Sequence, residues 1–178
     1  MNPADSAPHA PIWRLLARSL LLFATALSLS FQINALPDDR QQPVKINSDR
    51  AVRNENTGVT QFIGNATLIQ GSLVIRADNI TVSHSNEGIK EITAVGKPAI
   101  FEQQPKANQG VVTAKALRIE YEVGSEIVHL INNASIDQDG SLITSDTIRY
   151  DMQNALAEAG GSERVNIVIP PNQTTTEQ

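Results

Sequence analysis

Apolar and polar residues alternate along most of the chain from residue 44 to residue 169, which is the pattern of β-strands with one buried face. The alternation is clearest from Gln61 to Val82, where two alternating runs flank Gln70-Gly71-Ser72. Glycines punctuate the region at intervals mostly near the ~8–12 residues typical of turns in all-β chains. A helical period is suggested only within residues 151–159, which we interpret as a strand pair because the equivalent residues 83–95 contain an Asn-Glu-Gly turn. The sequence therefore predicts an all-β fold.

The segment from Gln61 to Val82 recurs 68 positions later, from His129 to Tyr150. A shorter pattern of apolar, polar, small and charged residues occurs four times, at Ile46–Asp49, Ile75–Asp78, Val112–Lys115 and Ile143–Asp146. Units this short cannot bury an apolar face alone, so they are expected to stack. Each unit is expected to supply a few strands of about six residues.

Strand alternation assigns side chains to two faces. Taking Ile75 as inward places Arg76 and Asp78 outward, and a kink near Asp78 and Asn79 then brings Ile80 inward. The predicted body is two twisted sheets with an aliphatic slot between them. The residues assigned to this slot are Val44, Ile46, Phe62, Ala66, Leu68, Leu73, Ile75, Ala77, Ile80, Val82, Ile92, Phe101, Leu117, Ile119, Tyr121, Leu130, Ile136, Ile143, Ile148, Tyr150, Val165, Ile167 and Ile169.

Residues 1–35 carry the features of a secretory signal peptide: arginines, an apolar run and a small residue at position 35. The apolar run, residues 19–31, has 13 residues, whereas a spanning helix needs about 20. An uncleaved membrane anchor is the alternative. Residues 36–43 are predicted to be a linker, residues 44–169 the folded domain, and residues 170–178 a disordered tail.

Strands are predicted at both ends of the domain, at Val44–Ser48 and Val165–Ile169. An uncovered edge strand is a template for pairing, so the first strand of one copy could pair with the last strand of another. Such a contact does not close on itself and gives open chains of molecules. The alternative is that flanking segments shield both edges. The residues assigned to these oligomer edges are Val44, Ile46, Ser48, Val165, Ile167 and Ile169.

The residue content excludes several kinds of chemistry. With no cysteine and a net charge of −5, the chain lacks thiol chemistry and the basic character of nucleic-acid binders. His9, His84 and His129 stand apart from one another, and no catalytic motif is present. We therefore predict no enzyme activity, no metal site and no cofactor. A long aliphatic slot with few aromatic residues suits acyl chains, although an ordinary core is the default interpretation.

An ordered set of short motifs resembles a known family. These are residues 42–49 (QPVKINSD), Gly64-Asn65-Ala66 with Gln70-Gly71, residues 75–78 (IRAD) and residues 96–99 (GKPA). In this order, with the signal peptide and the repeat, they are similar to the OstA-like family of periplasmic lipopolysaccharide-export proteins. The resemblance covers residues 42–170, nearly the whole mature chain.

The resemblance implies an open, twisted antiparallel β-jellyroll of stacked short strands, located in the periplasm. It implies a groove for the acyl chains of lipid A, and it implies head-to-tail stacking from the inner to the outer membrane. The implied partners are lipopolysaccharide, further copies of the chain, inner-membrane LptC with its transporter complex, and the outer-membrane LptD translocon. The predicted groove residues are Val44, Ile46, Phe62, Ala66, Leu68, Ile75, Ala77, Ile80, Val82, Phe101, Leu117, Ile119, Tyr121, Ile143, Ile148 and Tyr150.

Two alternatives remain open at the level of sequence. One is a membrane-anchored, LptC-like component of the same pathway, which would keep residues 1–35. The other is a β-solenoid scaffold that binds no lipid.

Overall fold

The computed structural model describes residues 39–86, 88–106, 109–162 and 164–171. These residues all belong to one compact unit, residues 35–178. The predicted signal peptide (1–35) and most of the predicted tail (170–178) lie outside the described residues, so the domain boundaries stay predictions. No helix in the described ranges is long and apolar enough to cross a membrane.

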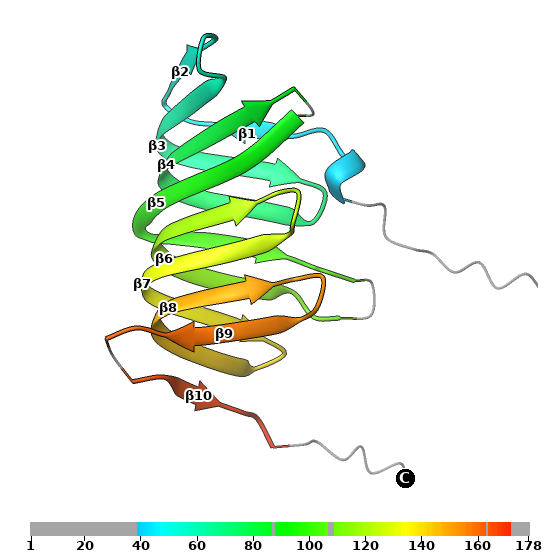
Figure 1. Cartoon of the computed structure of the whole chain (residues 1–178), viewed down its shortest axis with the longest axis vertical. Helices are drawn as coiled ribbons and strands as arrows, with labels where there is room; N and C mark the ends of the chain where they lie inside the picture. Colours follow the sequence, from blue (N-terminus) through cyan, green and yellow to red (C-terminus); the bar gives the residue numbers. More distant parts are fainter. Residues whose placement is uncertain (1–38, 87, 107–108, 163, 172–178) are drawn as a thin grey trace, which may run out of the picture. The chain divides into compact units, whose positions relative to one another are not determined.

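The described elements are almost all strands (Figure 1). A short 3-10 helix, η2 (Asp39–Gln41), comes first. The strands are β1 (Lys45–Asn47), β2 (Arg50–Asn54), β3 (Val59–Gln70), β4 (Leu73–Ser85), β5 (Gly88–Gln103), β6 (Val112–Glu122), β7 (Ile127–Gln138), β8 (Ser141–Asp151), β9 (Leu156–Gly160) and β10 (Asn166–Val168).

These strands form one continuous antiparallel sheet of ten strands, in the order β1-β3-β4-β5-β6-β7-β8-β10. Strand β2 also pairs with β3, and β9 also pairs with β8. The all-β, open antiparallel architecture predicted from the sequence is confirmed. The prediction of two separate sheets built from strands of about six residues is wrong, because β3 to β8 run for 11 to 16 residues each.

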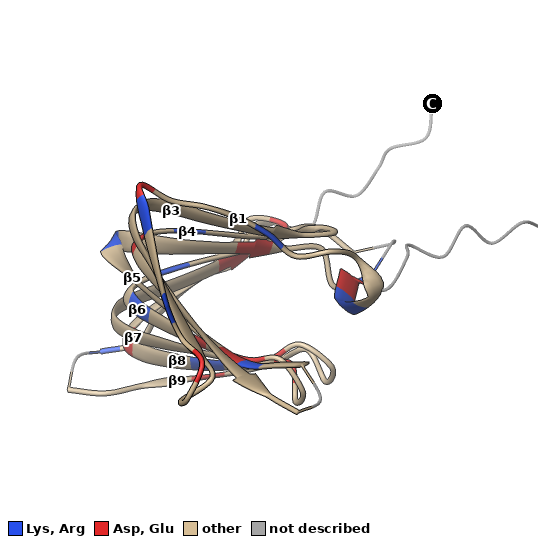
Figure 2. Cartoon of the chain, turned by 90° about the horizontal axis from the view of Figure 1, so that it is seen from above, with Lys and Arg blue, Asp and Glu red and all other residues tan. Residues whose placement is uncertain are grey.

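Each long strand is bent at one crease, so the single sheet has two arms that face each other. The pairing register shifts where strands cross the crease, for example between Ile63 and Ala66 in the β3–β4 pair. Figure 2 shows the sheet end-on, with the two arms diverging from the crease towards an open side. The first arm holds residues 45–47, 66–70, 73–77, 99–103, 112–116, 134–138, 141–145 and 166–168. The second arm holds residues 50–54, 59–63, 79–85, 88–95, 118–122, 127–131, 147–151 and 156–160.

Small side chains line the inner side of the crease, where the two arms are closest. They appear as directly opposed pairs, Ala66 with Ala77, Ala99 with Ala116, and Ala134 with Ser145. A larger side chain at these positions would collide with side chains of the facing arm, because the packed interior has no spare space. The alanines and serine in the sequence are therefore what allows the sheet to fold back on itself.

The bend itself uses left-handed backbone conformations. Gly64 and Asn65 have φ values of 80° and 46°, and the equivalent residues of the repeat, Asn132 and Asn133, have φ values of 64° and 55°. Glycine and asparagine tolerate this region better than other residues. A bulge of this kind increases the local twist and redirects the strand.

The repeat predicted from the sequence is confirmed as a repeat of paired strands. In β3–β4, Phe62 pairs with Ile80, and 68 residues later Leu130 pairs with Ile148 in β7–β8. The predicted kink after Asp78 is also confirmed, because the β4–β5 register shifts between Arg76 and Asn79. The sequence repeat is therefore a structural repeat of two-strand hairpins that each cross the crease.

The repeated glutamines have a shared role in this arrangement. Gln70 Nε2 donates to the carbonyl oxygens of Arg40 (3.3 Å) and Gln42 (3.1 Å). Gln138 Nε2 donates to the carbonyl oxygen of Gly110, at 3.4 Å. Gly110 and Gln42 are themselves 68 positions apart, so each glutamine fixes the segment that leads into a neighbouring strand.

Candidate functional site

The inward side chains of the two arms form rows that run across the strands. In the first arm, cross-strand pairing links Ile46, Leu68, Ile75, Phe101, Ala114, Ile136, Ile143 and Ile167 in one row. In the second arm, it links Phe62, Ile80, Ala94, Ile119, Leu130 and Ile148. Nearer the open side, the second arm has a further row of Val82, Ile92, Tyr121, Val128 and Tyr150. The interior is thus an apolar strip that continues from one edge of the sheet to the other.

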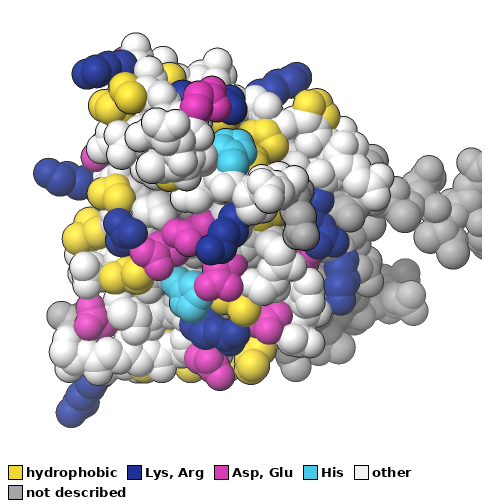
Figure 3. All heavy atoms as spheres, turned by 45° about the horizontal axis from the view of Figure 1, so that its top comes forward, with side chains coloured by type: hydrophobic (Ala, Val, Ile, Leu, Met, Phe, Trp, Pro, Cys, Tyr) yellow, Lys and Arg dark blue, Asp and Glu magenta, His cyan; other side chains and the backbone are white. Residues whose placement is uncertain are grey.

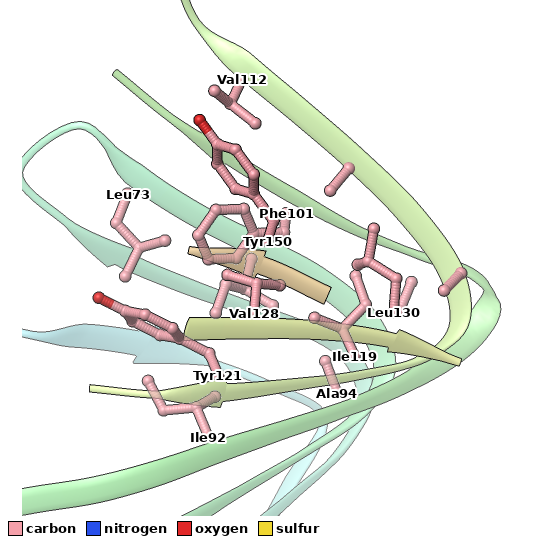
Figure 4. Close-up of a cluster of buried hydrophobic side chains, with 14 of the residues drawn as sticks. Leu73, Ile92, Ala94, Phe101, Val112, Ile119, Tyr121, Val128, Leu130 and Tyr150 are labelled. Carbon is pink, nitrogen blue, oxygen red and sulfur yellow. The ribbon is translucent and has the colours of Figure 1, made fainter. Parts of the chain in front are cut away.

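The two arms pack against each other in the middle of this strip. Phe101 of the first arm and Tyr121 of the second meet edge to face, with ring centroids 5.5 Å apart. Figure 4 shows Phe101, Leu73 and Val112 close to Tyr121, Tyr150 and Val128. The central residues are fully buried, with Leu68, Ile75, Ile80, Phe101 and Leu130 at 0% exposure. In this conformation the centre of the interior is a closed core.

The interior is almost free of polar side chains. Among the described residues, the buried polar ones are Thr60 and Ser145. Ser145 Oγ donates to the carbonyl oxygen of Gly160 at 2.9 Å, so its hydroxyl is satisfied. The phenol of Tyr150 is neutral at neutral pH, as for any tyrosine, and burial, and after it the neighbouring Asp151 carboxylate, raises its pKa further. Separating the arms would therefore expose apolar surface and few polar groups.

Most predicted groove residues point inward, and one does not. Ala66, Leu68, Ile75, Ile80, Val82, Phe101, Ile119, Tyr121, Ile148 and Tyr150 are buried. Val44, Ile46, Phe62, Ala77 and Ile143 are partly buried and pack against the same core. The prediction that Leu117 points inward is wrong, because its side chain is 37% exposed and Ala116 takes the inward position. The β6–β7 register shifts between Lys115 and Arg118. Counting every second residue back from Tyr121 through Ile119 therefore assigns Leu117 to the inward face, although the shift turns it outward.

This correction leads to a paired stability prediction. Leu117→Ser should change the free energy of unfolding by less than about 1 kcal/mol, because the side chain already contacts solvent. Ala116→Leu should destabilise the fold by about 1–3 kcal/mol, because the crease has no space for a larger side chain. Urea denaturation of both variants measures the difference. Equal losses in the two variants would contradict the assignment of faces.

Several interior residues were not named from the sequence: Ala94, Ala99, Val112, Ala114, Ala116, Val128, Ala134 and Met152. Most are small, so they give a weak apolar signal. Ala94 and Met152 follow two residues after Ile92 and Tyr150, respectively, and strict alternation would have found them.

Among the described residues, no further strand pairs with either end of the sheet, and each end is built from two short strands. Strands β1 and β2 pair with successive stretches of β3, and β10 and β9 pair with successive stretches of β8. Val165, Ile167 and Ile169 are 40%, 57% and 75% exposed, so none of the three is buried in the single chain as predicted. Ile167 nevertheless pairs with Ile143 and lies at the end of the inward row of the first arm. At the other end, Ser48 lies between β1 and β2, and its hydroxyl donates to the carbonyl oxygen of Arg50 at 3.0 Å. The positions predicted as oligomer edges thus lie at the two ends of the sheet.

A short segment, residues 39–44, lies at the open side near the β1 edge, and we call it the strap. The Asp39 carboxylate accepts hydrogen bonds from Ser72 N (2.7 Å), Ser72 Oγ (2.5 Å) and Gln103 Nε2 (3.0 Å), all in or beside the first arm. Arg40 forms an ion pair with Glu126 in the β6–β7 turn of the second arm, at 3.1 Å. The strap therefore connects the two arms, a contact that the sequence did not predict.

A pocket of about 560 Å³ lies beside the strap. The strap, the first arm, the second arm and the β6–β7 turn all contribute to its lining, which consists of Arg40, Gln42, Val44, Gln70, Ser85, Gly88, Ile89, Lys90, Val123 and Gly124. Val44, Ile89 and Val123 also pack against the core. The pocket is therefore a place where the apolar interior meets solvent.

Known proteins share both the sequence and the architecture. The family model described as LptA/(LptD N-terminal domain) LPS transport protein matches residues 45–155. The chain is 34% identical over 164 residues to the lipopolysaccharide export system protein LptH of Pseudomonas aeruginosa, covering 86% of this chain and 94% of that protein. It is 35% identical over 165 residues to LptA of Haemophilus influenzae, covering 90% and 95%. Escherichia coli LptA is 32% identical over 162 residues, covering 89% and 87%.

The crystal structure of Pseudomonas aeruginosa LptH, described as the LptA-homologous periplasmic component of the lipopolysaccharide transport device, has the same fold. It superimposes with a TM-score of 0.71 at 33% identity, covering 76% of this chain and all of that one. Family match, identity over most of the chain and shared bent sheet agree with the resemblance seen in the short motifs. The chain belongs to the LptA/LptD N-terminal-domain family of lipopolysaccharide transport proteins.

Proposed function

We propose that this protein carries lipopolysaccharide through the periplasm from the inner to the outer membrane. It shields the acyl chains between its two arms and stacks end to end with further copies. The observation that carries the proposal is the apolar strip that runs from one open edge of the sheet to the other, in a chain of this family.

The energetic need for such a strip follows from the lipid. Exposing a twelve-carbon acyl chain to water costs about 10 kcal/mol, at ~0.8 kcal/mol for each methylene. Because the central side chains already pack together, acyl chains enter only when the arms separate. Separation exposes mainly apolar surface, which the acyl chains cover again, so one apolar contact replaces another. An interior lined with unpaired polar groups would not allow this exchange.

The sheet geometry supports stacking through both arms at once. Neighbouring strands run antiparallel throughout. Placing β10 of one copy beside β1 of the next continues this alternation in the first arm. Placing β9 beside β2 continues it in the second arm. The inward row that ends at Ile167 in one copy would then continue at Ile46 in the next.

The partners follow from the same edges. The β1 edge would meet inner-membrane LptC and its transporter complex, and the β10 edge would meet the outer-membrane LptD translocon. The chain would act without enzymatic activity of its own, with the energy for transport supplied at the inner membrane. The relatives described above are lipopolysaccharide export system proteins, which supports these roles.

Photo-crosslinking in cells tests the binding surface. A photo-reactive residue at Ile46 or Ile75 should form an adduct with lipopolysaccharide, because both side chains face the interior. The same residue at Arg76 is the matched control, since Arg76 is next to Ile75 but faces outward. Adducts would be detected as lipopolysaccharide-reactive bands on denaturing gels. Adducts at Arg76 with none at Ile46 or Ile75 would place the lipid outside the arms and overturn the proposal.

A further inference from the structure

We propose that the pocket beside the strap holds the phosphorylated head group of an acylated glycolipid, with Lys90 and Arg40 as the groups that bind the phosphate. This inference rests on the proposed function, since it assumes that acyl chains occupy the interior. The inference adds a position for the charged part of the same lipid, which it places at the β1 end of the sheet.

The position of the pocket is the first argument. Its apolar residues are Val44 of the strap, Ile89 of the second arm and Val123 of the β6–β7 turn, and all three pack against the core. An amphiphile with chains between the arms must leave its head group where the interior meets solvent. The pocket volume of about 560 Å³ falls within the range of small-molecule sites, roughly 300–1,000 Å³.

The charges around the pocket are the second argument. Among the described lining residues, the two charged ones are both basic, Arg40 from the strap and Lys90 from β5. Lys90 is exposed, and within the described ranges no carboxylate forms an ion pair with it. Two cations beside an apolar surface complement a phosphate attached to an acylated sugar.

Arg40 is held near the pocket by Glu126, at 3.1 Å, with side-chain exposures of 47% and 24%. Ion pairs this exposed contribute little to stability. A phosphate can therefore take the place of the Glu126 carboxylate on the Arg40 guanidinium, which suits phosphate geometry. Glu126 would then remain accessible to water, so its loss of a partner has a small cost. The other acid of the strap, Asp39, already accepts hydrogen bonds from Ser72 and Gln103.

The other described turns and loops of the open side do not offer the same charges. The β5–β6 loop carries one described cation, Lys106, which does not line the pocket, and the β7–β8 turn carries Asp139. An anionic group is repelled at Asp139, whereas Arg40 and Lys90 together attract it near the strap. Surface charges elsewhere are mixed, as Figure 3 shows for one face, on which basic, acidic and histidine side chains lie together. The pocket is thus distinguished by having cations, an apolar wall and a path to the core in one place.

Matched lipids test the inference with the purified full chain. The probes are diphosphorylated lipid A and the same lipid A after removal of its phosphates. The quantity measured is the ratio of their dissociation constants. We expect the natural sequence to favour the phosphorylated lipid by about tenfold, Lys90→Gln to reduce this preference about threefold, and Arg40→Gln with Lys90→Gln to abolish it. Binding of the dephosphorylated lipid should be the same in all variants.

Two control variants separate this site from general electrostatics. Lys115→Gln removes one exposed positive charge from a residue that does not line the pocket, and it should leave the preference unchanged. Glu126→Gln breaks the ion pair while keeping the Arg40 charge, and it should keep or increase the preference. An equal effect of Lys115→Gln and Lys90→Gln would overturn the proposal in favour of net charge.

The remaining outcomes are also decisive. If both lipids bind equally well, the head-group site is wrong and the proposed function stands. If neither lipid binds, the proposed function fails and the inference fails with it. If inorganic phosphate alone binds with the same dependence on Lys90 and Arg40 and does not compete with the lipid, the site serves free phosphate, which contradicts the head-group assignment.

Discussion

Replacing Phe101 with alanine is expected to lower the free energy of unfolding by about 3–5 kcal/mol. Phe101 is 0% exposed, and its ring meets Tyr121 of the opposite arm edge to face at 5.5 Å. The substitution removes the largest fully buried side chain of the core and leaves a cavity between the arms. Urea or thermal denaturation of the purified protein measures the effect.

Phe62→Ala provides a matched control for this prediction, because it removes the same side chain from a partly buried position. Its cost should be clearly smaller, about 1–3 kcal/mol, since less buried contact is lost. A Phe101→Ala variant no less stable than Phe62→Ala would show that the contact between the arms contributes little. The closed core described above would then be a weak feature of the fold.

Ile167→Lys is expected to weaken self-association by at least about a hundredfold while leaving the monomer folded. Ile167 is 57% exposed in the single chain, so a lysine there stays in water and has little effect on monomer stability. In a stack it would lie between β8 and the β1 strand of the next copy. A charge buried there without a partner costs several kcal/mol. Light scattering or sedimentation at several protein concentrations measures the change.

Val111→Lys is the control for this prediction, because Val111 is also exposed, at 51%, but lies in the loop before β6 and away from both edges. It should leave association unchanged. A second test uses the absence of cysteine in the chain. A double variant with Ile46→Cys and Ile167→Cys should link copies into disulfide-bonded ladders under oxidising conditions. Ladders that form equally well with Val111→Cys in place of Ile167→Cys would argue against edge pairing.

The sequence predicted the all-β fold, the repeat and most of the inward residues. The reason is that strand alternation reports directly on which face is buried. It holds within each arm, so Leu68, Ile75, Ile80 and Val82 were placed correctly. The repeat strengthened the assignment, since two hairpins 68 residues apart carry the same pattern.

Other features depend on contacts between distant residues and were not predictable from local pattern. The crease interrupts the alternation of inward and outward residues, because the pairing register shifts where a strand crosses it. Leu117 lies at such a shift, and it was therefore assigned to the wrong face. A single bent sheet and two sheets give the same alternation on either side of a break. The strap depends on Asp39 meeting Ser72 and on Arg40 meeting Glu126, and neither pairing has a local sequence signal.

The crossing of every long strand from one arm to the other limits how this fold can change in length. Inserting one residue into a strand would shift the inward rows of one arm relative to the other. Adding a whole hairpin leaves every existing row in place and extends the strip by two strands. The length of each strand therefore fixes the cross-section of the bent sheet. The number of strands can vary, in steps of one hairpin. Gene duplication of the kind that the 68-residue repeat implies is the change that this architecture accommodates without repacking its interior.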